Sequence, residues 1–108
     1  MSKYDDFVDS VVEGAKALAK EQFKDYEETA GDDAELFLKQ MKDDLARWTK
    51  LLASKDLTQE DFSDLVQAKR DLAKLHALAQ KGIILTKLER FRAKFIDLVV
   101  DSAFGIFS

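Results

Sequence analysis

The chain has 108 residues, of which 46% are hydrophobic and 35% charged, and it contains neither proline nor cysteine. This length fits one domain, and this composition fits a folded rather than a disordered chain. The lack of cysteine excludes disulfides and cysteine-bound zinc, and the formal net charge of −4 argues against nucleic acid, whose phosphates require a basic surface.

The first predicted helix spans residues 4–28. Its apolar residues recur every three or four positions and share one face of a helical wheel. The residues expected to face the core are Tyr4, Phe7, Val8, Val11, Val12, Ala15, Leu18, Ala19, Phe23 and Tyr26. Gly31 follows this segment and is expected to end the helix, because glycine adopts the left-handed conformation of a helix C-terminus without strain.

A second helix is predicted over residues 33–54. Asp32 or Asp33 can cap its N-terminus, because an aspartate oxygen accepts a hydrogen bond from a free backbone N–H group there. Leu36 falls outside the apolar face, which consists of Phe37, Leu38, Met41, Leu45, Trp48, Leu51 and Leu52. One face of this helix is therefore expected in the core.

The third predicted helix spans residues 59–81 and has the strongest start signal in the chain. Thr58 is placed to cap it, with Asp61 three residues later as in a capping box. Leu57 can pack on Phe62 and fix the entry of the chain into the helix. The expected core face contains Phe62, Leu65, Val66, Leu72, Ala73 and Ala77.

Two polar residues, Lys69 and His76, follow Phe62 on this face at successive intervals of seven. Lys69 can extend its ammonium group to the rim, and His76 can make a hydrogen bond in the core. Alternatively, both can fix the register or the oligomeric state of a helix pair, as polar residues do in coiled coils. A catalytic role for His76 is not expected, because the sequence supplies no partner that would orient the imidazole.

Gly82 separates the third helix from a fourth, which is predicted over residues 86–107. Lys81 and Gly82 resemble a helix C-terminus with glycine just beyond it. Thr86 with Glu89 three residues later can form a second capping box. The sequence therefore favours a break at Gly82 over an uninterrupted helix.

Four helices of similar length joined by short connections predict an all-α fold, a four-helix up-down-up-down antiparallel bundle. It would form a single domain over residues 1–108. The alternative has three segments, with one long kinked helix over residues 59–107 that is exchanged between the copies of a dimer. A single glycine destabilises a helix by only about 1 kcal/mol, so this alternative stays open.

The fourth helix is apolar over most of its circumference. Its polar stripe is narrow and consists of Thr86, Lys87, Arg90, Lys94, Asp97 and Asp101. A surface helix normally buries one face, so the apolar remainder must be covered by the rest of the chain, a second copy, a protein partner or lipid. Arg92 lies within the apolar arc and is expected to have an acidic partner if it is buried.

This helix predicts a non-enzymatic protein–protein interaction module that self-associates, with a dimer favoured. The expected interface residues are Phe91, Arg92, Phe95, Leu98, Val99, Ile106 and Phe107. The chain has one histidine and four isolated glycines, so no catalytic residue, metal site or cofactor site is predicted. No nucleic acid partner is expected.

Two other functions remain open. Residues 95–107 can lie in a membrane surface as an in-plane anchor, although Asp97 and Asp101 would then face anionic headgroups. An acidic stripe on the first helix can instead bind a basic partner, as an inhibitor or antitoxin-like protein does; it contains Asp5, Asp6, Asp9 and Glu13. The sequence shows neither a signal peptide nor a transmembrane stretch, so a cytoplasmic location is expected. Size and composition resemble those of short helical accessory proteins of bacteria and their phages.

Overall fold

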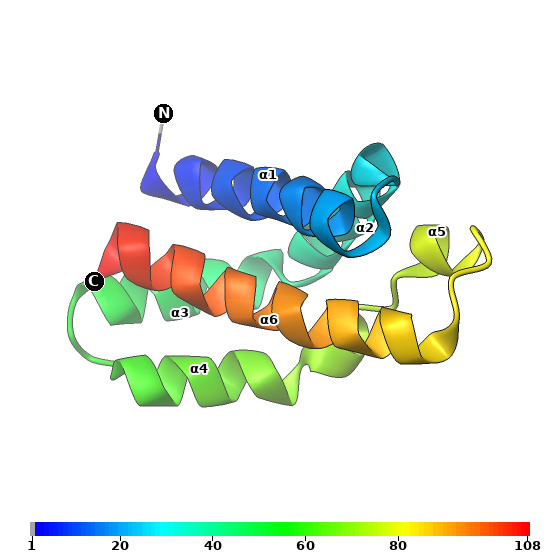
Figure 1. The fold of residues 1–108 in the computed structure, drawn as a ribbon. Helices are drawn as coiled ribbons and strands as arrows, with labels where there is room; N and C mark the ends of the chain where they lie inside the picture. Colours follow the sequence, from blue (N-terminus) through cyan, green and yellow to red (C-terminus); the bar gives the residue numbers. More distant parts are fainter. Residues whose placement is uncertain (1) are drawn as a thin grey trace.

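The computed structural model describes residues 2–108, and every regular element in that range is a helix (Figure 1). In chain order these are α1 (Lys3–Phe23), α2 (Glu27–Gln40), α3 (Lys42–Ala53), α4 (Gln59–Ala68), the short 3-10 helix η1 (Arg70–Leu72), α5 (His76–Ala79) and α6 (Leu85–Phe107). Six α-helices replace the four predicted ones, because the second and third predicted segments are each divided.

The helix α6 lies at the centre of the fold, with α1 on one side and α3 and α4 on the other (Figure 1). It runs antiparallel to α1: the Phe7 ring lies 5.9 Å from Phe107, and the Phe23 ring lies 5.5 Å from Phe91. The helix α2 packs mainly on α1, and α5 packs mainly on α2. The all-α class is therefore confirmed, whereas the arrangement around a central α6 differs from the predicted up-down-up-down bundle.

The helix α1 ends at Phe23 rather than at residue 28. Ser2 caps its start, since the serine hydroxyl accepts a hydrogen bond from the backbone N–H of Asp5 at 3.1 Å. Lys24 adopts the left-handed conformation (φ 63°) and closes the helix, and Tyr26 (φ 71°) turns the chain into α2. Lys24 and Tyr26 thus provide the left-handed backbone at the end of the first helix that the sequence predicted for Gly31.

Gly31 does not end a helix, because it lies inside α2 and is buried. A Cβ atom at this position would lie 2.7 Å from the Cε atom of Lys16 on α1. The glycine thus allows the side chain of Lys16 to pack closely on the α2 backbone.

The predicted second helix is interrupted at Met41, between α2 and α3. Met41 has a non-helical backbone (φ −96°, ψ 7°), and its side chain is buried in the core. Neither Asp32 nor Asp33 caps a helix of its own segment, because α2 begins several residues earlier, at Glu27. The predicted start at residue 33 is therefore wrong, because α2 already includes residues 27–32.

Thr58 is confirmed as the cap of α4, since its hydroxyl oxygen accepts a hydrogen bond from the backbone N–H of Asp61 at 3.0 Å. The helix ends at Ala68 rather than at residue 81, and η1 follows it. Leu75 (φ 55°) then redirects the chain into α5. Because the predicted third helix is divided here, its expected face is not continuous.

Gly82 (φ 81°) confirms the predicted break before the last helix. The helix α6 begins at Leu85, one residue before the predicted boundary, and Ile84 precedes it with an extended backbone. Thr86 therefore lies inside the first turn, and the capping box predicted for it does not form.

Most of the residues predicted to face the core are buried. The fully buried large side chains include Phe7, Phe37, Phe62, Phe91, Phe95, Met41, Leu45, Leu52, Leu78 and Ile96. Leu36 is 44% exposed, as its place outside the apolar face predicts. Leu72 was expected in the core and is 39% exposed, because η1 rather than a continuous helix carries it.

Candidate docking surface at the start of α6

The chain itself covers the middle of α6. Phe91, Phe95 and Val99, all predicted as interface residues, are buried with exposed fractions of 0–1%. Leu98, Ile106 and Phe107 are partly buried against the same core. These six side chains therefore contribute mainly to the core of the single chain.

Arg92 has the acidic partner that the sequence predicted, and this partner lies on the same helix. Its guanidinium pairs with the carboxylate of Glu89, one turn earlier in α6. Its Nε–H donates a hydrogen bond to the backbone carbonyl of Ala73 at 2.7 Å. Arg92 thus ties the segment after η1 to α6 within one chain.

Lys69 and His76 form no polar seam. Lys69 follows the last residue of α4, and His76 is the first residue of α5, so no continuous helix aligns them. Both side chains are exposed. The spacing of seven therefore has no structural counterpart.

The apolar surface that the chain leaves uncovered lies at the start of α6. Leu85 is 71% exposed and Ile84 is 62% exposed, whereas Leu88, one turn further along, is 8% exposed. Large aliphatic side chains with this exposure are the ones expected to meet a partner, particularly when they lie next to each other.

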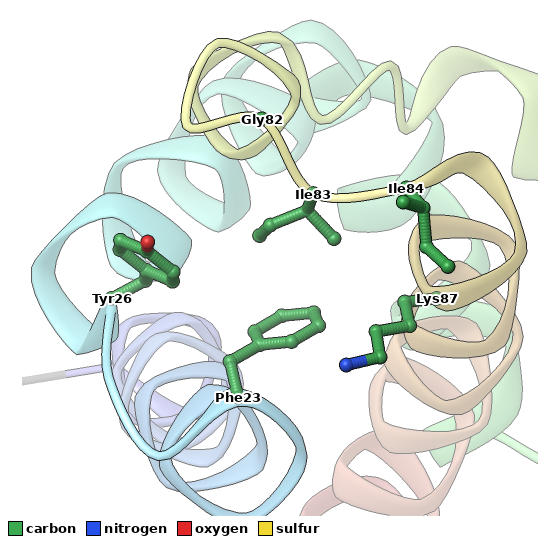
Figure 2. Close-up of a pocket in the computed structure, with 6 residues that line it drawn as sticks. All are labelled: Phe23, Tyr26, Gly82, Ile83, Ile84 and Lys87. Carbon is green, nitrogen blue, oxygen red and sulfur yellow. The ribbon is translucent and has the colours of Figure 1, made fainter.

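A hollow of about 220 Å³ is lined by Ile84, the residue directly before Leu85 in the chain. Figure 2 shows its walls: Phe23, the last residue of α1, and Tyr26, the residue before α2, face the segment that leads into α6. On that opposite side the lining residues are Gly82, Ile83, Ile84 and Lys87. We call the hollow together with Leu85 the docking surface.

The backbone on one side of the docking surface is held in an uncommon conformation. Of the four non-glycine residues with positive φ in the described part of the chain, Lys24 and Tyr26 belong to the turn between α1 and α2 that forms this side. The left-handed conformation costs roughly 1–2 kcal/mol for an ordinary L-residue, so the surrounding structure must stabilise it. Backbone strain of this kind tends to gather at functional sites.

A buried carboxylate fixes α5, the element before the docking surface. Asp33 on α2 is 6% exposed and accepts hydrogen bonds from the backbone N–H groups of Ala77 (3.1 Å) and Leu78 (2.9 Å). A helix of four residues is too short to be stable alone, so it depends on such a contact. Asp33 thereby positions the segment that continues through Gly82 into the hollow.

The two sides of the hollow differ in charge. Residues 21–28 carry one lysine and four acidic residues, a net charge of −3. Residues 81–87, which form the opposite side, carry Lys81 and Lys87 and no acidic residue, a net charge of +2. Among the ion pairs of residues 2–108, none involves Lys81 or Lys87, which are both exposed. These ammonium groups are therefore available to an acidic group of a partner.

The opposite end of the molecule has two further hollows, and Tyr4 lines both. The hydroxyl of Tyr4 is buried and has no hydrogen-bond partner among residues 2–108. Burial raises the pKa of Tyr4 above its ordinary value of 10.0, and the carboxylate of Asp43 adds to the effect. Both causes disfavour the phenolate, so this residue stays neutral over the physiological range.

The acidic stripe predicted on α1 is exposed. Asp5, Asp6, Asp9 and Glu13 all lie on the solvent side of the helix. In the range 2–108, no three metal-binding side chains gather closely enough to hold an ion. Over the same residues, none of the helices has the length and apolar character needed to cross a bilayer.

Comparison with known proteins gives no relative for this chain: no family model, no curated protein and no solved structure matches it at a significant level.

The sequence did contain a signal for the docking surface. Ile83, Ile84 and Leu85 are three consecutive large apolar residues directly after Gly82. Such a run cannot place every side chain on one helical face, so at least one is expected at the surface. The sequence could not supply the second side, because Phe23 and Tyr26 lie about sixty residues away and meet this run only in the folded chain.

Proposed function

We propose that this protein is a non-enzymatic interaction module that binds a protein partner at the docking surface. The observation that carries the proposal is the pair of exposed aliphatic side chains, Ile84 and Leu85, beside an apolar hollow. A hollow of about 220 Å³ exceeds the roughly 150 Å³ that holds a benzene molecule in engineered cavities, so it has room for one apolar side chain.

The proposed mechanism is burial of apolar surface around a central anchor. Hot spots of protein interfaces are side chains that fill a pocket, with less important contacts around them. Phe23, Tyr26 and Ile83 would supply the pocket, and the exposed Leu85 would supply an apolar contact at its edge. The lysines near the rim would add orientation and association rate more than affinity.

This proposal moves the interface from the middle of α6 to its first turn. Phe91, Phe95 and Val99 already lie in the core, so exposing them to a partner would require unfolding part of the chain. The same reasoning applies to an in-plane membrane anchor over residues 95–107, whose large apolar side chains pack against the core. Neither the middle of α6 nor residues 95–107 therefore offer a free apolar surface to a partner or to a membrane.

Site-specific photo-crosslinking tests the proposal in cells that produce the protein. A photoreactive side chain at position 85 should give a covalent adduct with a protein, because Leu85 would lie at the edge of the interface. The matched control is position 36, since Leu36 is also an exposed leucine (44%) but lies on α2, outside the docking surface. Absence of an adduct at position 85, or equal adducts at both positions, would contradict the proposal.

A further inference from the structure

We infer that the partner at the docking surface is a second copy of this chain, arranged about a two-fold axis; this inference rests on the proposed function. The charge pattern carries it. Glu27 and Glu28 directly follow Tyr26 on one side of the hollow, whereas Lys87 lines the other side and Lys81 directly precedes Gly82 there (Figure 2).

A surface with an apolar centre between an acidic side and a basic side complements itself. In a two-fold interface the same patch is used by both copies, so each contact occurs twice with the roles exchanged. When the two-fold axis lies in the interface and runs between the acidic and the basic side, it places the basic side of one copy over the acidic side of the other. Both charge pairs are then favourable, whereas an acidic or a basic partner would match only one side.

The apolar residues fit the same arrangement. Leu85 is 71% exposed and does not line the hollow of its own chain. It is free to enter the hollow of the second copy, while the second copy's Leu85 enters the first. Each copy would then fill the other's pocket, and the two exposed leucines would be covered together.

The acidic side offers two defined groups for this pairing. Glu27 and Glu28 begin α2, directly after the left-handed Tyr26 that lines the hollow. Glu28 lies 3.7 Å from Lys16 of its own chain, and this exposed pair is weak enough to be exchanged for another. Lys81 and Lys87 on the basic side make no ion pair within residues 2–108.

A charge-exchange experiment tests the two-fold arrangement. One variant carries Lys81→Glu with Lys87→Glu, and the other carries Glu27→Lys with Glu28→Lys. Each variant alone would place like charges opposite each other, so light scattering should give the monomer mass of 12.3 kDa, whereas the wild type should approach twice that value as concentration rises. An equimolar mixture of the two variants should recover the dimer mass. Residues 21–28 and 81–87 then carry net charges of −3 and −2 in the first variant and of +1 and +2 in the second, so opposite charges face each other.

Two single variants separate the apolar contact from the charges. Leu85→Asp should remain monomeric at all concentrations, and Leu36→Asp should dimerise like the wild type. Circular dichroism of every variant should show the same helix content, so that loss of the dimer is not loss of the fold.

Several outcomes would overturn the inference. They are a wild type that stays at 12.3 kDa throughout the concentration series, and variants that dimerise alone or fail to pair when mixed. A monomer that sediments with vesicles of anionic phospholipid through Lys81 and Lys87 would replace the second copy by a membrane. A crosslink from position 85 to a different protein would overturn this inference and leave the proposed function standing, whereas no crosslink would remove both.

Discussion

The last turns of α6 and its first turn have opposite surroundings. Ala103 is fully buried and Leu85 is 71% exposed, although the two residues are 18 positions apart. At 3.6 residues per turn this spacing is five full turns, so both residues point to the same side of the helix. The contrast arises because α1 and α4 pack against the later turns, through Phe7 on Phe107 and Phe62 on Phe104, whereas the side chain of Leu85 is left open to solvent.

The apolar character of a helix therefore does not tell which part of it forms an interface. The entire core-facing side of α6 qualifies by sequence, and only its first turn remains available after folding. The elements that cover a helix come from elsewhere in the chain, and the following experiments test how sharply the covered and uncovered parts differ.

The largest difference should appear when a ring is removed from the covered part. Phe95 is 1% exposed, and its ring lies 5.4 Å from that of Phe37. Phe95→Ala should lower the free energy of unfolding by about 3–5 kcal/mol, because it creates a cavity in the core. Leu85→Ala, measured by urea denaturation in dilute solution, should stay within about 0.5 kcal/mol of the wild type. Equal effects of the two variants would contradict the distinction.

An intermediate effect is expected from the carboxylate that fixes α5. Asp33→Ala should destabilise the protein by about 1–3 kcal/mol, because two buried N–H groups lose their acceptor. Hydrogen exchange at Ala77 and Leu78 should accelerate in this variant. The neighbouring Asp32 is exposed, so Asp32→Ala should change neither the stability nor the exchange rates appreciably. Unchanged hydrogen exchange at both amides in Asp33→Ala would show that the hydrogen bonds to Asp33 do not hold α5 in place.

Replacing either of two glycines by alanine should change the stability by a smaller amount, with opposite signs at the two positions. Gly82 has φ 81° and Gly105 lies within α6, and a Cβ atom would meet nothing within 4 Å at either position. Gly82→Ala should destabilise by roughly 1–2 kcal/mol through backbone strain alone. Gly105→Ala should stabilise by up to about 1 kcal/mol, since alanine favours the helix. Thermal unfolding should therefore move in opposite directions, and shifts of the same sign would contradict the backbone argument.

The smallest effect concerns the far end of the molecule and is confined to alkaline pH. The raised pKa of Tyr4 means that the unfolded chain releases the phenolic proton before the folded chain does. The stabilising contribution is therefore complete below pH 10.0 and decreases as the pH rises towards the folded-state pKa. Tyr4→Phe should lose less stability than the wild type between neutral and alkaline pH in parallel urea titrations. Identical pH profiles would argue against a buried, neutral phenol.

Local signals in the sequence predicted the elements that depend on local interactions. The cap at Thr58 and the break at Gly82 are confirmed, since each requires only neighbouring residues. Most residues of the predicted apolar faces are also buried in the structure, because burial follows the helical period wherever the helix is continuous.

The errors share a physical cause, which is contact between residues far apart in the chain. Asp32 or Asp33 was expected to cap the second predicted helix, whereas Asp33 caps α5, more than forty residues later. Arg92 donates a hydrogen bond to the backbone carbonyl of Ala73. In the predicted third helix this carbonyl would instead have accepted a hydrogen bond from the backbone N–H four residues later. The docking surface needs both Phe23 and Ile84, so only its Ile83–Leu85 half could be read from the sequence.

The antiparallel pairing of α1 with α6 has a practical consequence. Since the rings of Phe7 and Phe107 are in contact, the start of α1 and the end of α6 lie at the pole opposite the α5–α6 loop (Figure 1). A dye, an affinity tag or a fused reporter attached at either end would project away from the hollow. The module could equally be spliced into a surface loop of a host protein, because entry and exit points near each other favour insertion. In each case Leu85, at the opposite pole, would stay accessible to a partner.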